Sequence, residues 1–242
     1  MPLHDQQHRD ELDQRGFVLL PRVIAESGIA SLIEVITATA HLPGDRRRAD
    51  RTYAVRHLLW DVPELSPRLA TVGVDDAASC LLGQTAFAIS ATLFDKHPEA
   101  NWTVPGHQDL VMPVADRSET ERAATAGFEG WSSKSGVTYV ELPSDVLTGL
   151  VALRIHLDDC PVENGALAVV PESHRLGKLR DVRIVEYSRD EFELCAARAG
   201  DVLAMKPLLV HRSSPSQSPA HRRVLHVVYA IADPGAGVRW KR

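Results

Sequence analysis

The apolar positions of this chain change their spacing about one third of the way along it. In residues 22–41 the apolar side chains recur at intervals of three and four, with a Glu-Ser pair near the start, which predicts an amphipathic helix. Residues 64–82 repeat this spacing, with Pro67 near one beginning. We therefore expect residues 1–83 to be mostly helical support that contributes no obvious chemistry.

The spacing becomes typical of β-strands after Gln84. Short runs rich in Val, Leu, Ile and Ala are separated by Gly, Pro, Asn or Asp, as in strands joined by turns. The runs are 86–94, 107–114, 136–142, 149–157, 165–173, 201–210 and 223–232. Helices followed by strands favour a mainly β fold with N-terminal helices over a doubly wound parallel sheet. The expected architecture is a double-stranded β-helix, a jelly-roll or cupin-like barrel buttressed by α-helices, with residues 84–242 as its core.

Asn164 and Gly165 give the strongest turn signal in the β region. They lie between the runs LRIHLDD, residues 153–159, and ALAVV, residues 166–170. A two-residue type I′ turn needs positive φ at both positions, and Asn-Gly adopts it readily. We therefore predict that the two runs form an antiparallel hairpin.

Composition excludes several classes of protein. The 242 residues suit a single domain, 1–242, because barrels and sandwiches of roughly 200 to 250 residues often form one unit. A hydrophobic content of 44% and a charged content of 24% are ordinary for globular proteins and argue against disorder or fibrous repeats. The net charge of −5, without a long Lys/Arg run, predicts no nucleic-acid or membrane partner. We expect a small-molecule substrate.

Cysteine usage and the start of the chain bear on its location. Cys80, Cys160 and Cys195 are odd in number and widely spaced, which argues against a disulfide framework or a thiolate metal site. The first residues lack the apolar region of a signal peptide, and no apolar segment approaches membrane-spanning length. The expected location is the cytoplasm.

Three side chains of the β region could hold a metal ion. His107 and Asp109 form a His-X-Asp triplet, and because side chains two apart on a strand share a face, they should project together while Gln108 points away. His211 follows the apolar run 201–210 and is expected to end its strand, and a barrel can bring the ends of remote strands to one mouth. Two imidazoles and one carboxylate leave open positions on an octahedral iron(II), whereas a structural zinc cage is closed.

Arg222 follows His211 after a Ser/Pro-rich turn and begins the segment RRVLHVVYA, directly before the apolar run 223–232. Its guanidinium fork matches a carboxylate, so it is a candidate for co-substrate binding. Arg223 is the alternative, because strand alternation sends only one of the two side chains inward. The spacing from His211 favours Arg222.

Other residues are candidates for the pocket wall. Trp102, Trp131 and Lys134 flank the metal strand, where an aromatic wall and a cation would suit an acidic substrate; packing and a solvated charge are the alternative. Further strand residues share faces that either line a pocket or meet solvent, namely Arg154, His156 and His226.

Three segments together resemble the phytanoyl-CoA dioxygenase family of iron(II)- and 2-oxoglutarate-dependent oxygenases. They are LFDKHPEANWTVPGHQD, HLDDCPVENGALAVVPESHR and MKPLLVHRSSPSQSPAHRRVLHVVYA, and the similarity covers all but the two ends of the chain. The resemblance implies that His107, Asp109 and His211 bind Fe(II). It also implies that Arg222 binds the distal carboxylate of 2-oxoglutarate, with Ser213 as a helper.

The resemblance implies hydroxylation of an unactivated C–H bond, in which O2 and 2-oxoglutarate are consumed and succinate and CO2 are released. Asp109 separates the chain from halogenating relatives, which have a small residue at this position. Variable loops such as 115–136 supply substrate contacts in the family, so the sequence does not identify the substrate. Glu172 is a departure, because the family often has glycine there.

Two alternative functions use the same residues differently. A redox-silent zinc hydrolase or lyase on the same triad would need a general base, such as a glutamate, close to the metal-bound water. A jelly-roll binding protein without catalytic activity would need no intact triad.

Overall fold

The structure, a computed structural model, describes eight stretches of the chain: residues 5–37, 45–48, 51–97, 101–115, 125–180, 183–184, 192–217 and 221–241. The end of the predicted helix 22–41 and residues 116–124 of the predicted substrate loop lie outside the described residues.

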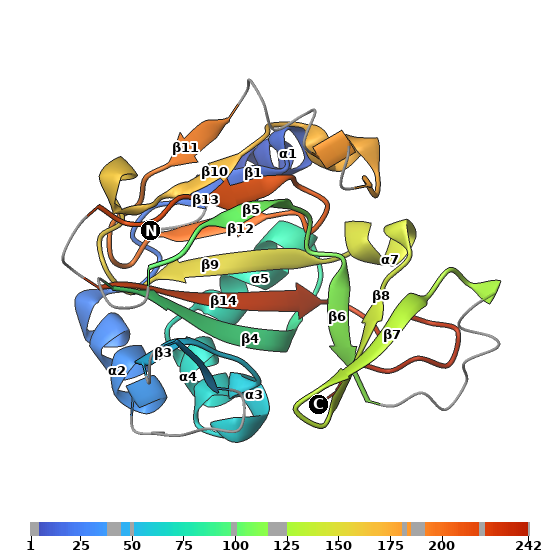
Figure 1. The fold of residues 1–242 in the computed structure, drawn as a ribbon, viewed down its shortest axis with the longest axis horizontal. Coiled ribbons are helices and arrows are strands. Elements are labelled where there is room, and N and C mark those ends of the chain that lie inside the picture. The colour runs from blue at the N-terminus through green and yellow to red at the C-terminus, as the bar shows by residue number, and fades with distance from the viewer. Residues whose placement is uncertain are drawn as a thin grey trace.

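Antiparallel strands dominate the described residues and form three sheets (Figure 1). The largest has the strand order β1 (Phe17–Leu20), β12 (Val202–Met205), β9 (Val151–His156), β14 (Arg222–Ala230), β4 (Phe87–Lys96), β3 (Arg51–Val55) and β2 (Asp45–Arg48). The second has the order β11 (Glu193–Cys195), β10 (Leu167–Val169), β13 (His211–Ser213) and β5 (Val104–His107). The third, which lies at one side in Figure 1, has the order β6 (Val111–Val114), β8 (Val137–Glu141) and β7 (Glu129–Lys134). The jelly roll predicted from the sequence is confirmed.

Helices cover one face of the largest sheet. The described helices are α1 (Asp5–Arg15), α2 (Glu26–Thr37), α3 (Leu58–Asp61), α4 (Leu65–Thr71), α5 (Val74–Leu82) and α7 (Ser144–Thr148), with 3₁₀ turns η1 (Val162–Asn164) and η2 (Ser173–Leu176). Buried side chains of α2, α4 and α5 form one cluster with those of the sheet. The helical support predicted for the fold is therefore present.

The two faces of the largest sheet differ in character. On β14, Leu225 and Val227 are buried in the helix-side cluster, whereas Arg222 and His226 point to the opposite face. Each fully buried Leu or Val contributes about 1.5–3 kcal/mol relative to an exposed one. The helix side thus stabilises the sheet, and its other face carries polar groups.

The predicted helices form with shorter bounds. α2 lies within the predicted 22–41 and buries Ile29, Leu32 and Ile36, which follow the three- and four-residue spacing. The helix predicted over 64–82 is divided into α4 and α5 by Gly73, whose φ of 81° is one that other residues rarely adopt.

The first third of the chain is not only support. β1, β2 and β3 join the largest sheet, and Ala54 and Arg56 line the central cavity, so this part of the chain also supplies strands and part of the cavity wall, which the sequence did not predict. β2 and β3 read DRRR and RTYAV and show little apolar alternation. They form because they extend the edge of an existing sheet through backbone hydrogen bonds.

The hairpin predicted at Asn164-Gly165 is wrong. β9 pairs with β12 and β14, whereas β10 pairs with β11 and β13, so the chain crosses here between two sheets. Of the two residues only Gly165 has a positive φ, 69°. A Cβ on Gly165 would lie 2.6 Å from the Ser214 carbonyl oxygen. The glycine therefore permits a close approach of two backbone segments.

The run 201–210 is not one strand. β12 ends at Met205 in the largest sheet, and after a turn His211 begins β13 in the second sheet. His211 therefore starts a strand, and the prediction that it ends one is wrong. The change of sheet brings it opposite β5.

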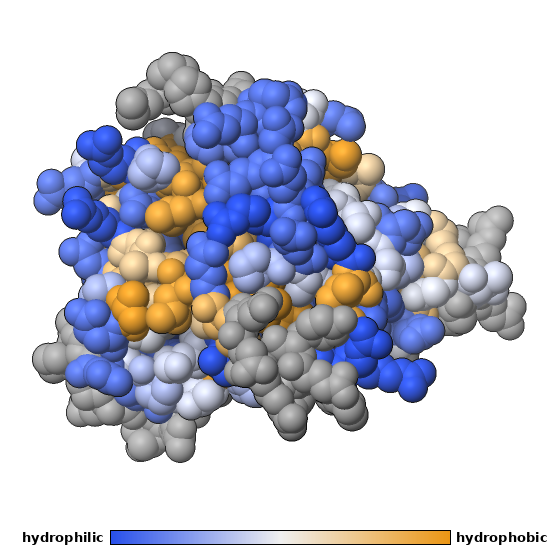
Figure 2. All heavy atoms as spheres, turned by 90° about the horizontal axis from the view of Figure 1, so that it is seen from above, coloured by the Kyte–Doolittle hydropathy of each residue, from blue (hydrophilic) through white to orange (hydrophobic). Residues whose placement is uncertain are grey.

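None of the described helices is long and apolar enough to cross a membrane. Figure 2 shows one face of the molecule, over which hydrophilic residues predominate with smaller apolar groups among them.

Candidate metal and co-substrate site

A cavity of about 400 Å³ lies on the polar face of the largest sheet. Inward side chains of β4, β9 and β14 form one wall, and β5, β13, β6 and β8 contribute the others. The volume is in the lower part of the range for small-molecule sites, roughly 300–1,000 Å³.

His107, Asp109 and His211 meet in this cavity. His107 and His211 are partners across β5 and β13, with ring centroids 4.2 Å apart. Asp109 Oδ1 lies 3.7 Å from His107 Nε2, and Asp109 Oδ2 lies 3.7 Å from His211 Nε2. One ligand atom from each residue lies within 4.8 Å of the others, so the three can hold a metal ion.

Local backbone contacts orient both imidazoles. His107 Nδ1 lies 2.9 Å from the Pro105 carbonyl oxygen, and His211 Nδ1 lies 2.9 Å from the Leu209 carbonyl oxygen. A carbonyl only accepts, so each Nδ1 carries the proton and each Nε2 presents a lone pair to the centre of the triad. Metal-binding histidines are commonly oriented in this way.

Asp109 joins the triad from a loop, and not from the strand that was predicted to carry it. β5 ends at His107, and Asp109 follows it in a loop, where its backbone N–H donates to the Pro207 carbonyl at 2.9 Å. Gln108 is buried and points away, as predicted, and its side-chain amide donates to the Leu208 carbonyl at 2.6 Å. The loop is thus held by the turn that precedes His211.

The electrostatics of the triad suit a cation. Burial lowers the pKa of His211 to about 3, so its ring is neutral near pH 7. Burial alone would raise the pKa of Asp109, but His211, His226 and His107 outweigh it and lower that pKa to about 2. Asp109 Oδ2 is buried and has no hydrogen-bond partner among the described residues. Deprotonated ligands and an unsatisfied buried carboxylate oxygen fit a divalent metal ion.

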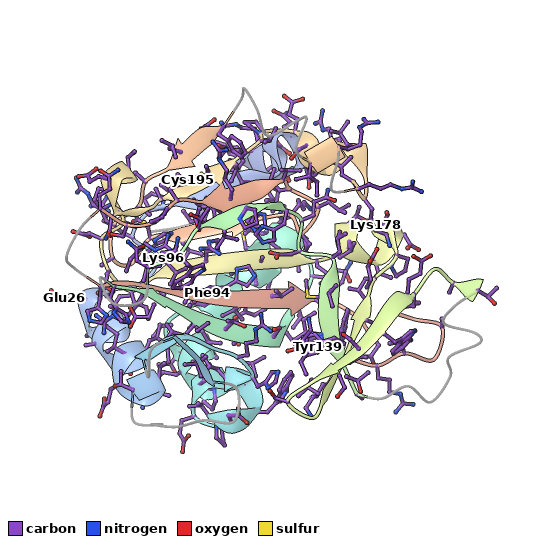
Figure 3. All side chains as sticks on the ribbon, viewed as in Figure 1. Glu26, Phe94, Lys96, Tyr139, Lys178 and Cys195 are labelled. Carbon is purple, nitrogen blue, oxygen red and sulfur yellow. The ribbon has the colours of Figure 1, made fainter. Side chains whose placement is uncertain are left out.

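Buried cations occupy another part of the cavity, which we call the cation end and define by Lys96, Arg222 and Ser213. Arg222 is 2% exposed and donates from Nη1 to the Gly165 carbonyl. Lys96 is its partner across β4 and β14, and its Nζ donates to Ser213 Oγ at 3.0 Å and to the Ser214 carbonyl at 2.7 Å. Figure 3 shows Lys96 over the central strands of the largest sheet. The cation end can accept an anion.

Burial depresses the pKa of each buried cation. It lowers the pKa of Lys96 to about 7, with Arg222 and Arg154 adding to the effect. It also lowers the pKa of Arg154 to about 10 and the pKa of Arg222. These cations therefore repel one another in the absence of an anion.

Arg222 and Arg223 point in different directions. Arg222 lines the cavity and its Nε has no partner among the described residues. Arg223 instead forms a two-pronged contact with Asp158, at 2.8 Å from Nε and 2.6 Å from Nη2. Only Arg222 is placed to meet a ligand in the cavity.

Two of the three residues predicted to form the pocket wall line the cavity, and the third does not. Trp102 and Lys134 line the cavity, with Lys134 Nζ 5.1 Å from the centroid of the Tyr139 ring. Trp131 is not among the lining residues and packs at the edge of the apolar cluster that includes Met112.

Lys96, Phe94 and Tyr139 line the cavity but were not predicted from the sequence. For Arg154 the sequence left two alternatives, a pocket wall or a solvent-facing position, and the structure places it in the cavity. Lys96 shares a strand face with Thr92 and Phe94, so a lysine in phase with an otherwise inward-facing row was the available signal. Arg154 lies inside an apolar run, where a charge needs a partner. Tyr139 gave no such signal; Figure 3 shows it at the side of the three-stranded sheet.

The family follows from the sequence comparison. The family model described as phytanoyl-CoA dioxygenase (PhyH) matches residues 12–224, so the chain belongs to this family. The family predicted from the sequence is confirmed. A search of curated proteins gave no significant match.

Solved structures share the fold at low sequence identity. A crystal structure of SnoK, the non-heme alpha-ketoglutarate-dependent carbocyclase from nogalamycin biosynthesis, matches with a TM-score of 0.69 and 20% identity over 96% of this chain and 88% of that one. EctD from S. alaskensis, with 2-oxoglutarate and 5-hydroxyectoine, matches with a TM-score of 0.70 and 16% identity over 96% and 79%. AviO1 from Streptomyces viridochromogenes Tue57 matches with a TM-score of 0.65 and 20% identity over 95% and 96%.

Proposed function

We propose that this protein is an iron(II)- and 2-oxoglutarate-dependent oxygenase that hydroxylates an unactivated C–H bond of a small molecule. The observation that carries the proposal is the presence of the triad and of the buried guanidinium of Arg222, whose Nε has no hydrogen-bond partner among the described residues, in one cavity. The family and the 2-oxoglutarate-binding neighbour EctD support it. We also propose that residues 1–242 form one domain and that the protein acts in the cytoplasm.

His107, Asp109 and His211 would hold the iron through two neutral imidazoles and one carboxylate. Bound iron(II) would supply the activation of O2 and the oxidative decarboxylation of 2-oxoglutarate to succinate and CO2. Because only these three side chains would hold the metal, further coordination positions would remain for the co-substrate and O2. The protein's own contribution is to hold these side chains at fixed positions and to place the co-substrate.

Arg222 would bind the distal carboxylate of 2-oxoglutarate through Nε, which has no partner among the described residues, because Nη1 is already held by the Gly165 carbonyl. Ser213 would add a hydroxyl on the same side. The charges agree: the metal with Asp109 gives +1, 2-oxoglutarate gives −2, and Arg222 gives +1. A neutral total is favourable in a buried site.

The zinc alternative receives less support. A hydrolase on the same triad would need a general base near the metal-bound water. Among the described residues that line the cavity, the acidic ones are limited to Asp109, which is itself a ligand in either reading.

Anaerobic titration tests the proposal without knowledge of the substrate. Protein loaded with iron(II) should develop the visible charge-transfer absorption of a chelated 2-oxo acid when 2-oxoglutarate is added. On admission of O2 it should form succinate slowly. Protein loaded with zinc is the control and should give neither signal. Absence of both signals from correctly folded, iron-loaded protein would reject the proposal.

A further inference from the structure

The cavity carries more positive charge than the metal and co-substrate can balance. Among its described lining residues, one side chain is acidic, Asp109, whereas several are cationic: Arg56, Lys96, Lys134, Arg154, Arg212 and Arg222. Lys96, Arg154 and Arg222 are buried, with exposures of 0%, 6% and 2%. Buried charges without counter-charges are costly, so the positive charge of these three buried side chains indicates a further anion.

Two of the three buried cations already have assignments. Arg222 balances the distal carboxylate in the proposed function. Lys96 donates to Ser213 Oγ and to the Ser214 carbonyl. Because burial lowers the pKa of Lys96 to about 7, it carries only part of a charge near neutral pH. One full positive charge, that of Arg154, remains.

Arg154 is held beside the metal triad. It pairs with His226 across β9 and β14, and its Nη1 donates to His226 Nδ1 at 3.4 Å. His226 Nε2 lies 3.7 Å from Asp109 Oδ2. The guanidinium is therefore separated from a proposed metal ligand by one side chain, and both line the same cavity.

The guanidinium of Arg154 lacks an anionic partner. Its Nε is buried with no hydrogen-bond partner, and among the described residues it forms no ion pair with an acidic side chain. The nearest compensating charge is that of Asp109, which a bound metal would take up. The ring of Phe94, 6.0 Å from the guanidinium carbon, offers an apolar surface beside it.

We propose that the substrate carries a carboxylate, and that Arg154 binds it. This inference rests on the proposed function and adds the substrate class. One full positive charge left among the buried cations matches a carboxylate better than a doubly charged phosphate. Because Arg154 lies next to the triad, the C–H bond that reacts lies only a few bonds from that carboxylate. Three further cations at the cavity favour the approach of an anion: Arg56, which is half-buried, and Lys134 and Arg212, which are exposed.

A matched pair of probes tests the carboxylate site. Benzoate and its neutral analogue benzamide have nearly the same shape, and an aromatic ring suits a cavity lined by Phe94, Trp102 and Tyr139. Each is titrated calorimetrically into anaerobic protein that holds iron(II) and saturating 2-oxoglutarate. Wild-type protein should bind benzoate about tenfold more tightly than benzamide, which corresponds to about 1.4 kcal/mol.

The variants Arg154→Gln and Arg154→Met should lose this preference and bind the two probes with similar affinity. Their affinity for 2-oxoglutarate, measured without probe, should stay within about threefold of wild type. Arg223→Gln is the control, because that side chain pairs with Asp158 away from the cavity, and it should keep the preference. Thermal unfolding of the ligand-free variants checks that they fold, because the substitution also removes the hydrogen bond to His226.

Two results would overturn the inference. One is a wild-type protein that binds benzoate and benzamide equally. The other is an Arg154→Gln variant that keeps the preference but binds 2-oxoglutarate much more weakly, which would assign Arg154 to the co-substrate. Failure of the proposed function would appear separately, as the absence of the 2-oxoglutarate absorption in wild-type protein before any probe is added.

Discussion

At the metal end of the cavity, His107 and His211 are each oriented by the carbonyl of the residue two positions earlier. At the cation end, Arg222 and Lys96 are held by groups 57 and 117 residues away in sequence. The metal end is thus fixed by local backbone geometry, and the cation end exists only after the sheets have assembled. The two ends should therefore respond differently to substitution.

The largest expected effect is at the metal end. Asp109→Asn removes the anionic ligand and should weaken iron(II) binding by more than about a hundredfold, with loss of succinate formation. Calorimetric titration with iron(II) under anaerobic conditions measures this. Asp158→Asn removes a carboxylate outside the cavity and should leave metal affinity unchanged. Equal affinity in the Asp109 variant and wild type would remove Asp109 from the ligand set.

Arg222→Ala should weaken 2-oxoglutarate binding at the cation end and leave iron(II) binding at the metal end unchanged. Truncating one member of a desolvated charge pair costs about 2–5 kcal/mol, so the Kd for 2-oxoglutarate should rise by roughly one to three decades while iron(II) still binds. Arg222→Lys should recover only part, because a point charge lacks the two-pronged contact. Arg223→Ala is the matched control. If it weakens 2-oxoglutarate instead, the roles of the two arginines must be exchanged.

The pH dependence of stability tests the buried histidine of β9. Burial, with help from Arg154 and Arg222, lowers the pKa of His156 to about 3. Between about pH 6.5 and pH 3 the unfolded chain therefore binds a proton that the folded protein does not, so stability falls as pH falls, by up to about 1.4 kcal/mol per pH unit. His156→Leu should flatten this slope in urea unfolding measured from pH 7 to pH 5. Parallel curves for the two proteins would contradict the assignment.

The smallest expected effect is on the free energy of unfolding and concerns Glu172, which does not line the cavity. Glu172 has a φ of 64°, a left-handed conformation that costs a side chain about 1–2 kcal/mol. Glu172→Gly should raise the free energy of unfolding by about 0.5 kcal/mol, since part of the gain is offset by the flexibility of the unfolded chain. Glu172→Ala keeps the strain and should give no gain in chemical denaturation. Ligand affinities should not change in either variant.

The sequence was informative where local pattern decides the structure. The apolar spacing predicted α2, and the placement of His107, Asp109 and His211 led to a triad that the structure brings together. The loop geometry of Asp109 was not predicted. Strand alternation correctly placed Asp109 beside His107, but β5 ends at His107, so alternation does not explain the position of Asp109.

Features that depend on assembly were not predictable from local pattern. The strands β2 and β3 are charged and form only by pairing at a sheet edge. Gly165 was interpreted as part of a hairpin, although its role is a close approach to Ser214 from another part of the chain. Lys96 becomes a cavity residue only when β4 and β14 pair. That residues 1–242 form one domain stays a prediction.

The shortness of β13 has a thermodynamic consequence. His211 and Ser213 lie two residues apart on this three-residue strand, and Ser213 receives the hydrogen bond of Lys96. Any ligand that fixes His211 also restricts Ser213, and the reverse holds as well. By linkage, iron(II) and 2-oxoglutarate should therefore bind with positive cooperativity, each raising the affinity of the other by the same factor.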